Sequence, residues 1–202
     1  MIIHDDGHTN VVSADGLISP DDLRLKTNND GFKENSFDYI ITNPPFGSIV
    51  KQTEKAYLHQ YKMGIKDVDW LNPNSKVSER PSQSTEVLFI EQAEKYLVEG
   101  GYLAIVVPDG VLTNSSMQYV RDYISDTFRI VAIISMPQTA FSANGAGVKS
   151  SVMFLKKFSA SEKQTRIDLR NNIQNNLISN SEDGIRSVSY THLRAHETDQ
   201  YL

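Results

Sequence analysis

The sequence contains no cysteine, so disulfide bonds, thiolate metal sites and cysteine nucleophiles are all excluded. It has little excess charge of either sign. The net charge of −5 argues against binding of nucleic acid through overall charge alone. Any such binding would need a local basic surface or a partner subunit. No hydrophobic run reaches membrane-spanning length, and Met1–Ile3 leads into polar residues rather than a signal peptide. We therefore expect a soluble cytoplasmic protein with no membrane partner.

The 202 residues are enough for one domain with a hydrophobic core. Short apolar runs alternate with amphipathic stretches, and this order predicts an α/β fold with a doubly wound sheet. The last two strands have no helix between them, so we expect that pair to be antiparallel. The expected strands cover residues 10–12, 37–42, 102–107, 129–136 and 152–155, and the expected helices cover 84–99 and 116–128.

Three details of this pattern are specific enough to test. The continuous apolar run Tyr39–Ile41 favours a strand that is covered on both faces, as in a parallel sheet. Gly100 and Gly101 are expected to end the first helix. Residues 19–35 are expected to form a loop or a short helix, and residues 47–83 a long polar loop that is functional or mobile.

Polar residues follow three of the expected strands. Asp15, Asn43 and Asp109 each come directly after a short apolar run. In an open α/β sheet, ligands bind outside the carboxyl ends of the strands. We therefore expect a site at this edge, although Asp109 is interpreted as a turn former more readily than as a residue supporting the site.

The segment Asn43-Pro44-Pro45-Phe46 has the composition of a binding site for a flat amine. A residue before proline is held extended, and proline has a fixed φ and no N–H donor. The Asn43 side-chain carbonyl and the Pro44 backbone carbonyl could together accept both hydrogens of an –NH₂ group. Phe46 offers a stacking face, worth ~1–3 kcal/mol for a nucleic-acid base, and Gly47 permits close approach. The alternative is that Asn-Pro-Pro is only a turn after a strand.

An amine attached to an aromatic ring is a poor nucleophile because its lone pair is conjugated with the ring. Two acceptors on its hydrogens favour a pyramidal nitrogen and release the lone pair for attack. Placing that nitrogen in line with an activated methyl group would supply most of the catalysis, without a metal or a strong base. In a duplex the amine is inaccessible, so the base would have to be flipped out.

These residues resemble the S-adenosylmethionine-dependent N6-adenine DNA methyltransferases. The family pattern is present as Ile40-Ile41-Thr42-Asn43-Pro44-Pro45-Phe46, and the segments Leu88–Leu112 and Ala140–Lys157 resemble the modification subunit of type I restriction–modification systems. The resemblance implies a Rossmann-like methyltransferase sheet, DNA as substrate and S-adenosylmethionine as cofactor. It implies catalytic roles for Asn43, Pro44, Pro45 and Phe46, with Asp15 and Gly16 beside the adenine of the cofactor. The partners it implies are a specificity subunit, which reads the DNA sequence, and a restriction subunit.

One part of the family pattern is missing. The glycine-rich cofactor loop should precede Asp15 by many residues, and the sequence has almost nothing there. We therefore expect residues 1–158 to be the C-terminal portion of a methyltransferase domain that is truncated at its N-terminus, binding S-adenosylmethionine poorly and inactive alone. Residues 159–202 are expected to form a polar tail, of which 187–202 resemble a non-native read-through sequence.

Other motifs are weaker. Gly145-Ala-Gly147 is not a nucleotide loop, because Ser150 replaces the third glycine and Val148 precedes Lys149. His4 and His8, like His192 and His196, have a helical metal spacing, but Gly7 disfavours a helix and the second pair lies in the doubtful tail, so no metal is expected. A set of lysines and aromatics suits a DNA-facing segment or a plain solvated one: Lys51, Lys55, Lys62, Lys66, Tyr57, Tyr61 and Trp70.

Two classes of alternative function remain open. One is another amine methylation, of a guanine amine in RNA or of a glutamine amide in a protein. The resemblance makes methylation of a glutamine amide the weaker of these two alternatives, because enzymes of that group usually have Tyr in place of Phe46. The other class is a non-catalytic scaffold that binds a specificity subunit.

Overall fold

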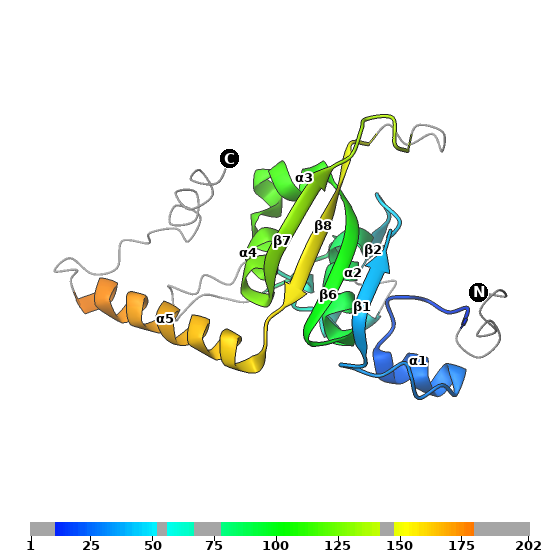
Figure 1. Ribbon diagram of the computed structural model, residues 1–202, viewed down its shortest axis with the longest axis horizontal. Helices are drawn as coiled ribbons and strands as arrows, with labels where there is room; N and C mark the ends of the chain where they lie inside the picture. Colours follow the sequence, from blue (N-terminus) through cyan, green and yellow to red (C-terminus); the bar gives the residue numbers. More distant parts are fainter. Residues whose placement is uncertain (1–10, 52–55, 67–77, 142–147, 180–202) are drawn as a thin grey trace.

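A four-stranded mixed sheet forms the centre of the molecule (Figure 1). The computed structural model describes residues 11–51, 56–66, 78–141 and 148–179. The strand order across the sheet is β1-β6-β8-β7; β1 and β6 are parallel, and β8 runs antiparallel to both of its neighbours. The expected α/β class and the antiparallel final pair are confirmed. The strands are β1 (Phe37–Thr42), β6 (Leu97–Pro108), β8 (Ser150–Lys157) and β7 (Phe128–Ser135).

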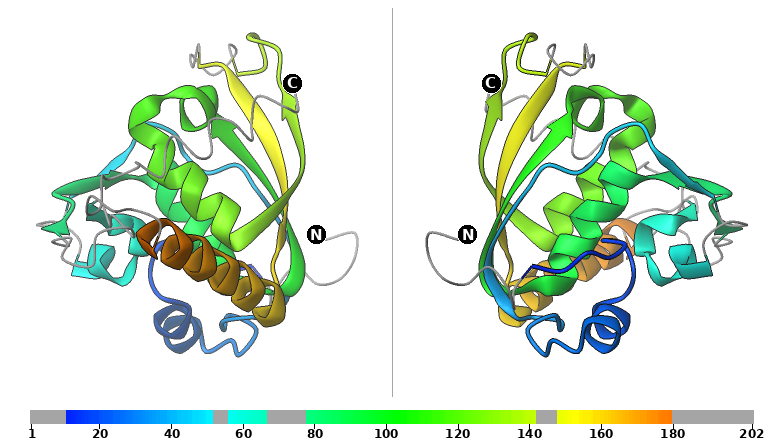
Figure 2. Two further views of the ribbon diagram at one scale, coloured as in Figure 1. Left: turned by 90° about the vertical axis from the view of Figure 1, so that its left-hand side faces the viewer. Right: turned by 90° about the vertical axis from the view of Figure 1, so that its right-hand side faces the viewer.

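Helices cover one face of this sheet (Figures 1 and 2). The two main ones match the expected helices: α2 (Thr85–Tyr96) and α4 (Gln118–Thr127), the latter preceded by α3 (Asp109–Thr113) and the short turn η4 (Ser115–Met117). Apolar side chains from α2, α4 and the inner face of the sheet form the core, and each fully buried one contributes roughly 1.5–3 kcal/mol. The core includes Val87, Ile90, Leu97, Leu103, Ile105, Val120, Ile124, Phe128, Met153 and Leu155.

The opposite face of the sheet is uncovered in the described part of the chain. On β1, Tyr39 is 72% exposed and Ile41 is 87% exposed. Tyr39 stacks on Tyr102 of β6, with ring centroids 5.8 Å apart, and Phe154 of β8 is exposed on the same sheet. The expectation that Tyr39–Ile41 is buried on both faces was therefore wrong. The apolar run predicted the parallel pairing of β1 with β6 correctly, but it does not indicate which face of the sheet is covered.

Two boundaries differ from the expected ones. Val11 and Val12, which were expected to belong to a strand, are not in one. Among the described residues, β1 pairs only with β6, so no strand from the Val11–Val12 region lies beside it. Gly100 lies within β6 rather than after a helix. Its φ of +76° is readily available only to glycine, and it occurs where the β1–β6 register shifts between Phe37 and Tyr39. The helix ends earlier, at Tyr96.

The segment between β1 and α2, expected to be a long loop, contains short elements. They are β2 (Ile49–Lys51) paired with β5 (Ser82–Ser84), β3 (Ile65–Lys66) paired with β4 (Ser78–Glu79), and the 3₁₀ turns η2 (Ala56–Gln60) and η3 (Lys62–Gly64).

Tyr61 lies between these turns, is 1% exposed and has the Lys95 ammonium 3.8 Å from its ring centroid. It is a core residue rather than a stacking platform for DNA. The Lys55 and Trp70 positions, and the side chains of Tyr57 and Lys66, lie outside the described residues.

Two further helices lie at the periphery. Residues 19–35 contain α1 (Pro20–Thr27), which Ser19 caps by accepting a hydrogen bond from the Asp22 N–H. The expected polar tail begins with α5 (Ala160–Ser179), and its residues 187–202 lie outside the described part. The described helices include none with the length and apolar character needed to cross a membrane.

Candidate functional site

The carboxyl ends of β1, β6 and β7 meet at one edge of the sheet. Asn43 follows β1, Asp109 follows β6, and Met136 follows β7. The amino end of β8 lies at the same edge, because Ser150 pairs with Pro108 and the Met136 N–H donates to the Ser150 carbonyl at 2.9 Å. The structure therefore brings Asn43 and Asp109 to one edge, as the sequence predicted.

The Asn43–Phe46 segment combines accessible and anchored residues. Asn43 and Pro45 are exposed, Pro44 is buried and Phe46 is half-buried. Among the described residues, no hydrogen bond engages the Asn43 side chain or the Pro44 carbonyl oxygen. Gly47 has a φ of +76° and open space where a Cβ would lie, so glycine is needed here for the turn rather than for packing. Two hydrogen-bond acceptors thus remain available on a rigid backbone.

The first turn of α2 holds this segment in place. The Thr85 hydroxyl donates to the Pro45 carbonyl oxygen at 2.9 Å, and the Thr85 N–H donates to the Ser48 carbonyl oxygen at 3.0 Å. Thr85 itself is 8% exposed. Of the two proline carbonyls, that of Pro45 is therefore engaged by the protein and that of Pro44 is not.

Phe46 has an aromatic neighbour that sequence reasoning missed. Its ring lies edge-to-face with that of Phe141, with centroids 6.2 Å apart and an interplanar angle of 87°. Phe141 lies on the connection between β7 and β8, far from Phe46 in the sequence. The only available signal was an aromatic residue just before a glycine-containing loop, which is too common to interpret alone.

Gly16, one of the two candidate cofactor residues, also contacts α2. A Cβ built on Gly16 would lie 3.1 Å from the Phe89 ring, so Gly16 packs closely on this helix. One Asp15 carboxylate oxygen accepts a hydrogen bond from the Leu17 N–H at 3.0 Å, which fixes the turn. Because Thr85 and Phe89 are one helical turn apart, α2 supports both predicted parts of the site.

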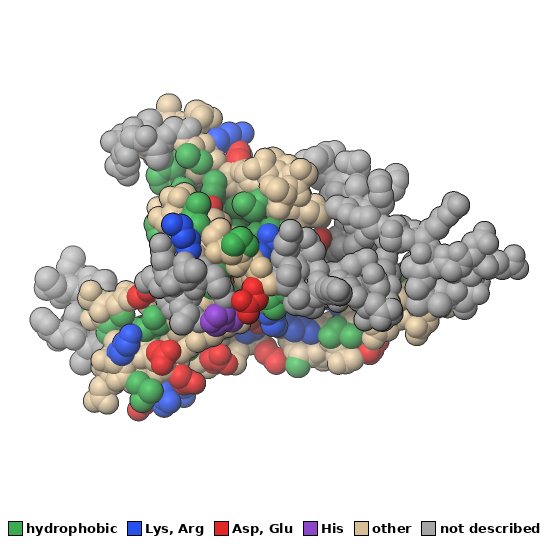
Figure 3. Space-filling model, turned by 180° about the vertical axis from the view of Figure 1, so that it is seen from behind, with side chains coloured by type: hydrophobic (Ala, Val, Ile, Leu, Met, Phe, Trp, Pro, Cys, Tyr) green, Lys and Arg blue, Asp and Glu red, His purple; other side chains and the backbone are tan. Residues whose placement is uncertain are grey.

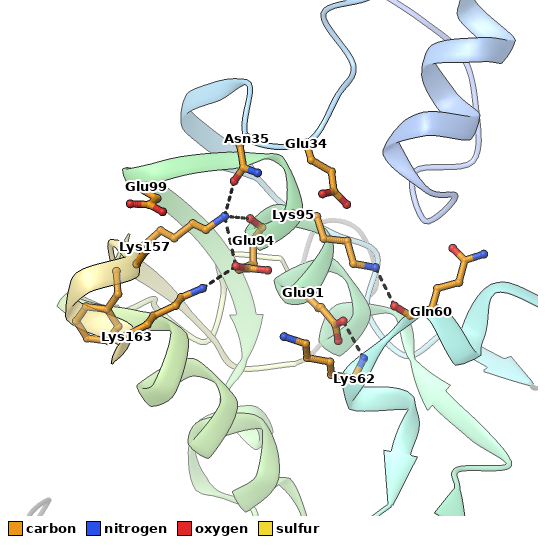
Figure 4. Close-up of a pocket in the computed structure, with 12 residues that line it drawn as sticks. Glu34, Asn35, Gln60, Lys62, Glu91, Glu94, Lys95, Glu99, Lys157 and Lys163 are labelled. Carbon is orange, nitrogen blue, oxygen red and sulfur yellow. Dashed lines mark hydrogen bonds and ion pairs between the residues drawn. The ribbon is translucent and has the colours of Figure 1, made fainter. Parts of the chain in front are cut away.

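A polar cavity of about 370 Å³ lies away from this site, at the amino ends of β1 and β6 (Figure 4). The Lys157 ammonium donates to the carbonyl oxygens of Glu94 and Leu97 at 2.6 and 2.7 Å, and to Asn35 Oδ1 at 3.0 Å. The Glu94 carboxylate pairs with Lys157 at 3.3 Å and with Lys163 at 3.0 Å. These charges neutralise one another. We therefore interpret the residues that line the cavity as a structural ion cluster, which joins β8 and α5 to α2.

The pKa values in this cluster follow from burial and the nearby lysines. Burial opposes ionisation of Glu94, but the ammonium groups of Lys157 and Lys163 outweigh it and lower the pKa of Glu94. Burial raises the pKa of Glu91, although the backbone N–H groups of Met63 and Lys62 oppose the shift. On the face seen in Figure 3, acidic and basic side chains are interspersed, in keeping with the slightly acidic composition.

Candidate metal ligands are few in the described part of the chain, which contains no group of three or more His, Asp or Glu side chains placed to hold a metal ion. His4, His8, His192 and His196 lie outside the described residues, as do Gly145 and Gly147.

Comparisons with known proteins agree on one family. A family model described as N-6 DNA Methylase matches residues 1–200. The methylase subunit of the type I restriction enzyme MpnII from Mycoplasma pneumoniae is 29% identical over 160 residues, which are 78% of this chain and 27% of that protein. The methylase subunit of the type I restriction enzyme EcoEI from Escherichia coli is 26% identical over 121 residues, covering 59% of this chain and 21% of that one.

Among solved structures, the M protein of the type I restriction enzyme EcoKI is 23% identical with a TM-score of 0.40, covering 61% of this chain and 21% of that chain. The chain thus spans 21–27% of the length of the two curated relatives described above.

Proposed function

The chain belongs to the N-6 DNA methylase family, and from this premise we propose that it carries the target-amine part of an adenine-N6 DNA methyltransferase. The whole protein would act as the modification subunit of a type I restriction–modification system. Its partners would be DNA, a specificity subunit and a restriction subunit. The relatives are themselves named as methylase subunits of type I restriction enzymes, which supports this assignment.

One observation carries the proposal. The Asn43 side chain and the Pro44 carbonyl lie at the carboxyl edge of the sheet, and no described residue engages either of them. They could accept the two hydrogens of the adenine N6 amine, while Phe46 and Phe141 provide aromatic surface for a base turned out of the duplex. Thr85 keeps the segment rigid, so the acceptors are oriented before the base arrives.

S-adenosylmethionine would supply the activated methyl group when bound. Among the described residues, Asp15 fits such a group, because a carboxylate can accept hydrogen bonds from an amino or hydroxyl group. The closeness of Gly16 to Phe89 leaves little room for a Cβ at position 16. Asp15 and Gly16 would therefore hold one end of the cofactor, and Asn43 and Pro44 would orient the accepting nitrogen.

The test is methyl transfer to DNA by the whole protein that contains this chain, assembled with its specificity subunit, comparing wild type with Asn43→Ala. Removing one preorganised polar contact from a reacting group typically lowers kcat by about 10²–10³-fold. Asn43 is exposed, so the variant should fold normally. Asn172→Ala, on the exposed surface of α5, is the matched control and should retain full activity. Equal activity of the Asn43 variant and wild type would refute the role of Asn43.

A further inference from the structure

Asp109 lies at the edge of the sheet where Asn43 follows β1 and where β8 begins. It follows β6, which lies between β1 and β8 in the sheet. The Ser151 hydroxyl donates to Asp109 Oδ1 at 2.8 Å, and the Lys149 ammonium lies 3.4 Å from Oδ2. The Asp109 N–H donates to the Lys149 carbonyl oxygen at 3.0 Å. The backbone and side chain of Asp109 therefore both bind the beginning of β8.

These contacts differ in strength. Ser151 is 3% exposed and the Asp109 side chain 24% exposed, so their hydroxyl–carboxylate bond is partly buried, and it is of the strong, charge-assisted kind. The Lys149 side chain is 52% exposed, and an ion pair of that kind contributes little. The bond to Ser151 is thus the principal contact of the Asp109 carboxylate.

The simpler role for Asp109 is that of a turn former or a helix cap, as the sequence suggested. It is the first residue of α3, but that helix has only five residues and its N-cap is Pro108. The carboxylate bonds across to β8, and among the described residues no N–H of α3 donates to it. A role confined to α3 therefore does not explain why the Asp109 carboxylate binds Ser151 of β8.

The strand that Asp109 contacts also anchors the segment that leads to Phe141. The Met136 N–H, at the end of β7, donates to the Ser150 carbonyl oxygen at 2.9 Å. The Ala140 N–H donates to the Pro137 carbonyl oxygen at 2.9 Å, and Phe141 follows directly and contacts the Phe46 ring. Described residues therefore connect the beginning of β8 to Phe141.

We propose that Asp109 is a positioning residue for the reaction. It holds the beginning of β8, and through it the Phe141 connection, so that Phe141 and Phe46 stay at the separation that a base requires. The inference rests on the proposed function for the reaction itself, but the positioning of Phe141 can be measured without it.

The first measurement is a distance. Because the chain has no cysteine, Ala140→Cys and Ser116→Cys create two unique sites for spin labels on exposed residues. Asp109→Ala should broaden the distance distribution between the labels, and Asp109→Asn should broaden it less, because its amide oxygen can still accept from Ser151. Asp126→Ala is the matched control: its carboxylate pairs with Arg170 on α5, so its loss should not change the distribution.

The second measurement is methyl transfer by the whole protein that contains this chain, assembled with its specificity subunit. Asp109→Ala should lower kcat by roughly 10- to 100-fold, as expected when a group near the reacting atoms is misplaced by about 1 Å, with KM for S-adenosylmethionine unchanged. Ser151→Ala should act in the same direction, and the double variant should be no worse than the more severe single variant, because both remove the same bond. Thermal unfolding of each variant separates this effect from a loss of fold.

An unchanged label distribution and unchanged kcat in Asp109→Ala would overturn the inference, as would fully additive effects of the Asp109 and Ser151 variants. If the whole protein that contains this chain transfers no methyl group to DNA, while Asp109→Ala still broadens the label distribution, the proposed function is overturned but the positioning of Phe141 is not.

Discussion

The hydroxyl of Thr85 donates to the carbonyl oxygen of Pro45 at 2.9 Å, and this bond ties the first turn of α2 to the segment after β1. The same helix contacts Gly16 through Phe89 one turn later. A buried helix rather than a loop therefore sets the relative position of the Asn43–Phe46 segment and the candidate cofactor turn.

Replacing Thr85 with valine should loosen the Asn43–Phe46 segment. Valine keeps the shape of threonine but cannot donate to Pro45, and the loss of one such hydrogen bond costs about 1 kcal/mol of stability. The free-energy cost calculated from the fall in kcat should exceed the loss of unfolding free energy, because the acceptors on Asn43 and Pro44 lose their fixed orientation. Urea unfolding and kcat measure the two effects. Thr85→Ser retains the hydroxyl and should behave like wild type; equal kcat in both variants would show that the bond is dispensable.

The ion cluster around Glu94 should make stability depend on pH. Its pKa is lowered in the folded state from an ordinary value of 4.5, so its ion pairs stabilise the protein above that pH. This stabilisation is lost as the pH falls through the lowered value. Glu94→Gln should therefore cost about 1–3 kcal/mol at pH 7, because it leaves the ammonium of Lys157 without its buried counter-charge.

The check is urea unfolding of wild type and Glu94→Gln across the acid range. The difference in the free energy of unfolding between the two proteins should shrink as the pH falls below 4.5. A difference that stays constant with pH would mean that Glu94 contributes by packing alone. Glu162, which pairs with Arg129 on the exposed surface, offers a comparison at which the same substitution should matter much less.

The uncovered face of the sheet should bind apolar probes. Tyr39 and Ile41 present large exposed apolar surfaces on adjacent positions of that face. A double substitution, Tyr39→Thr with Ile41→Thr, should keep the β propensity of the strand while lowering the fluorescence of a bound apolar dye and reducing self-association. Leu25→Thr on α1, where Leu25 is 73% exposed, is the control. Unchanged dye binding in the double variant would show that this face is not the apolar surface exposed in solution.

Local patterns in the sequence predicted much of the fold. The helices α2 and α4 and the strands β1, β7 and β8 were expected close to their observed positions, because each has an apolar period or a continuous apolar run; β6 begins at Leu97, inside the expected helix. Gly100 was misinterpreted because a glycine that ends a helix and one that permits a shift of strand register look alike in the sequence. The exposure of Tyr39 could not be predicted, since a single strand does not show what covers it.

The site was predictable only where it is contiguous. Asn43 to Phe46 combine unusual residue types at a strand end, and the chemistry could be argued from them directly. The roles proposed for Thr85, Phe141 and Asp109 rest on contacts with residues distant in the sequence, so they could be inferred only from the fold. Whether Asp15 and Gly16 hold a cofactor stays a prediction.

The central claim is that this chain directs methylation to the N6 amine of adenine. The direct measurement is transfer of an isotope-labelled methyl group from S-adenosylmethionine to DNA by the whole protein that contains this chain, assembled with its specificity subunit, followed by digestion to nucleosides and separation. The account predicts label in N6-methyldeoxyadenosine that disappears with Asn43→Ala and persists with Asn172→Ala. Label in another nucleoside, or label in N6-methyldeoxyadenosine that survives Asn43→Ala, would contradict it.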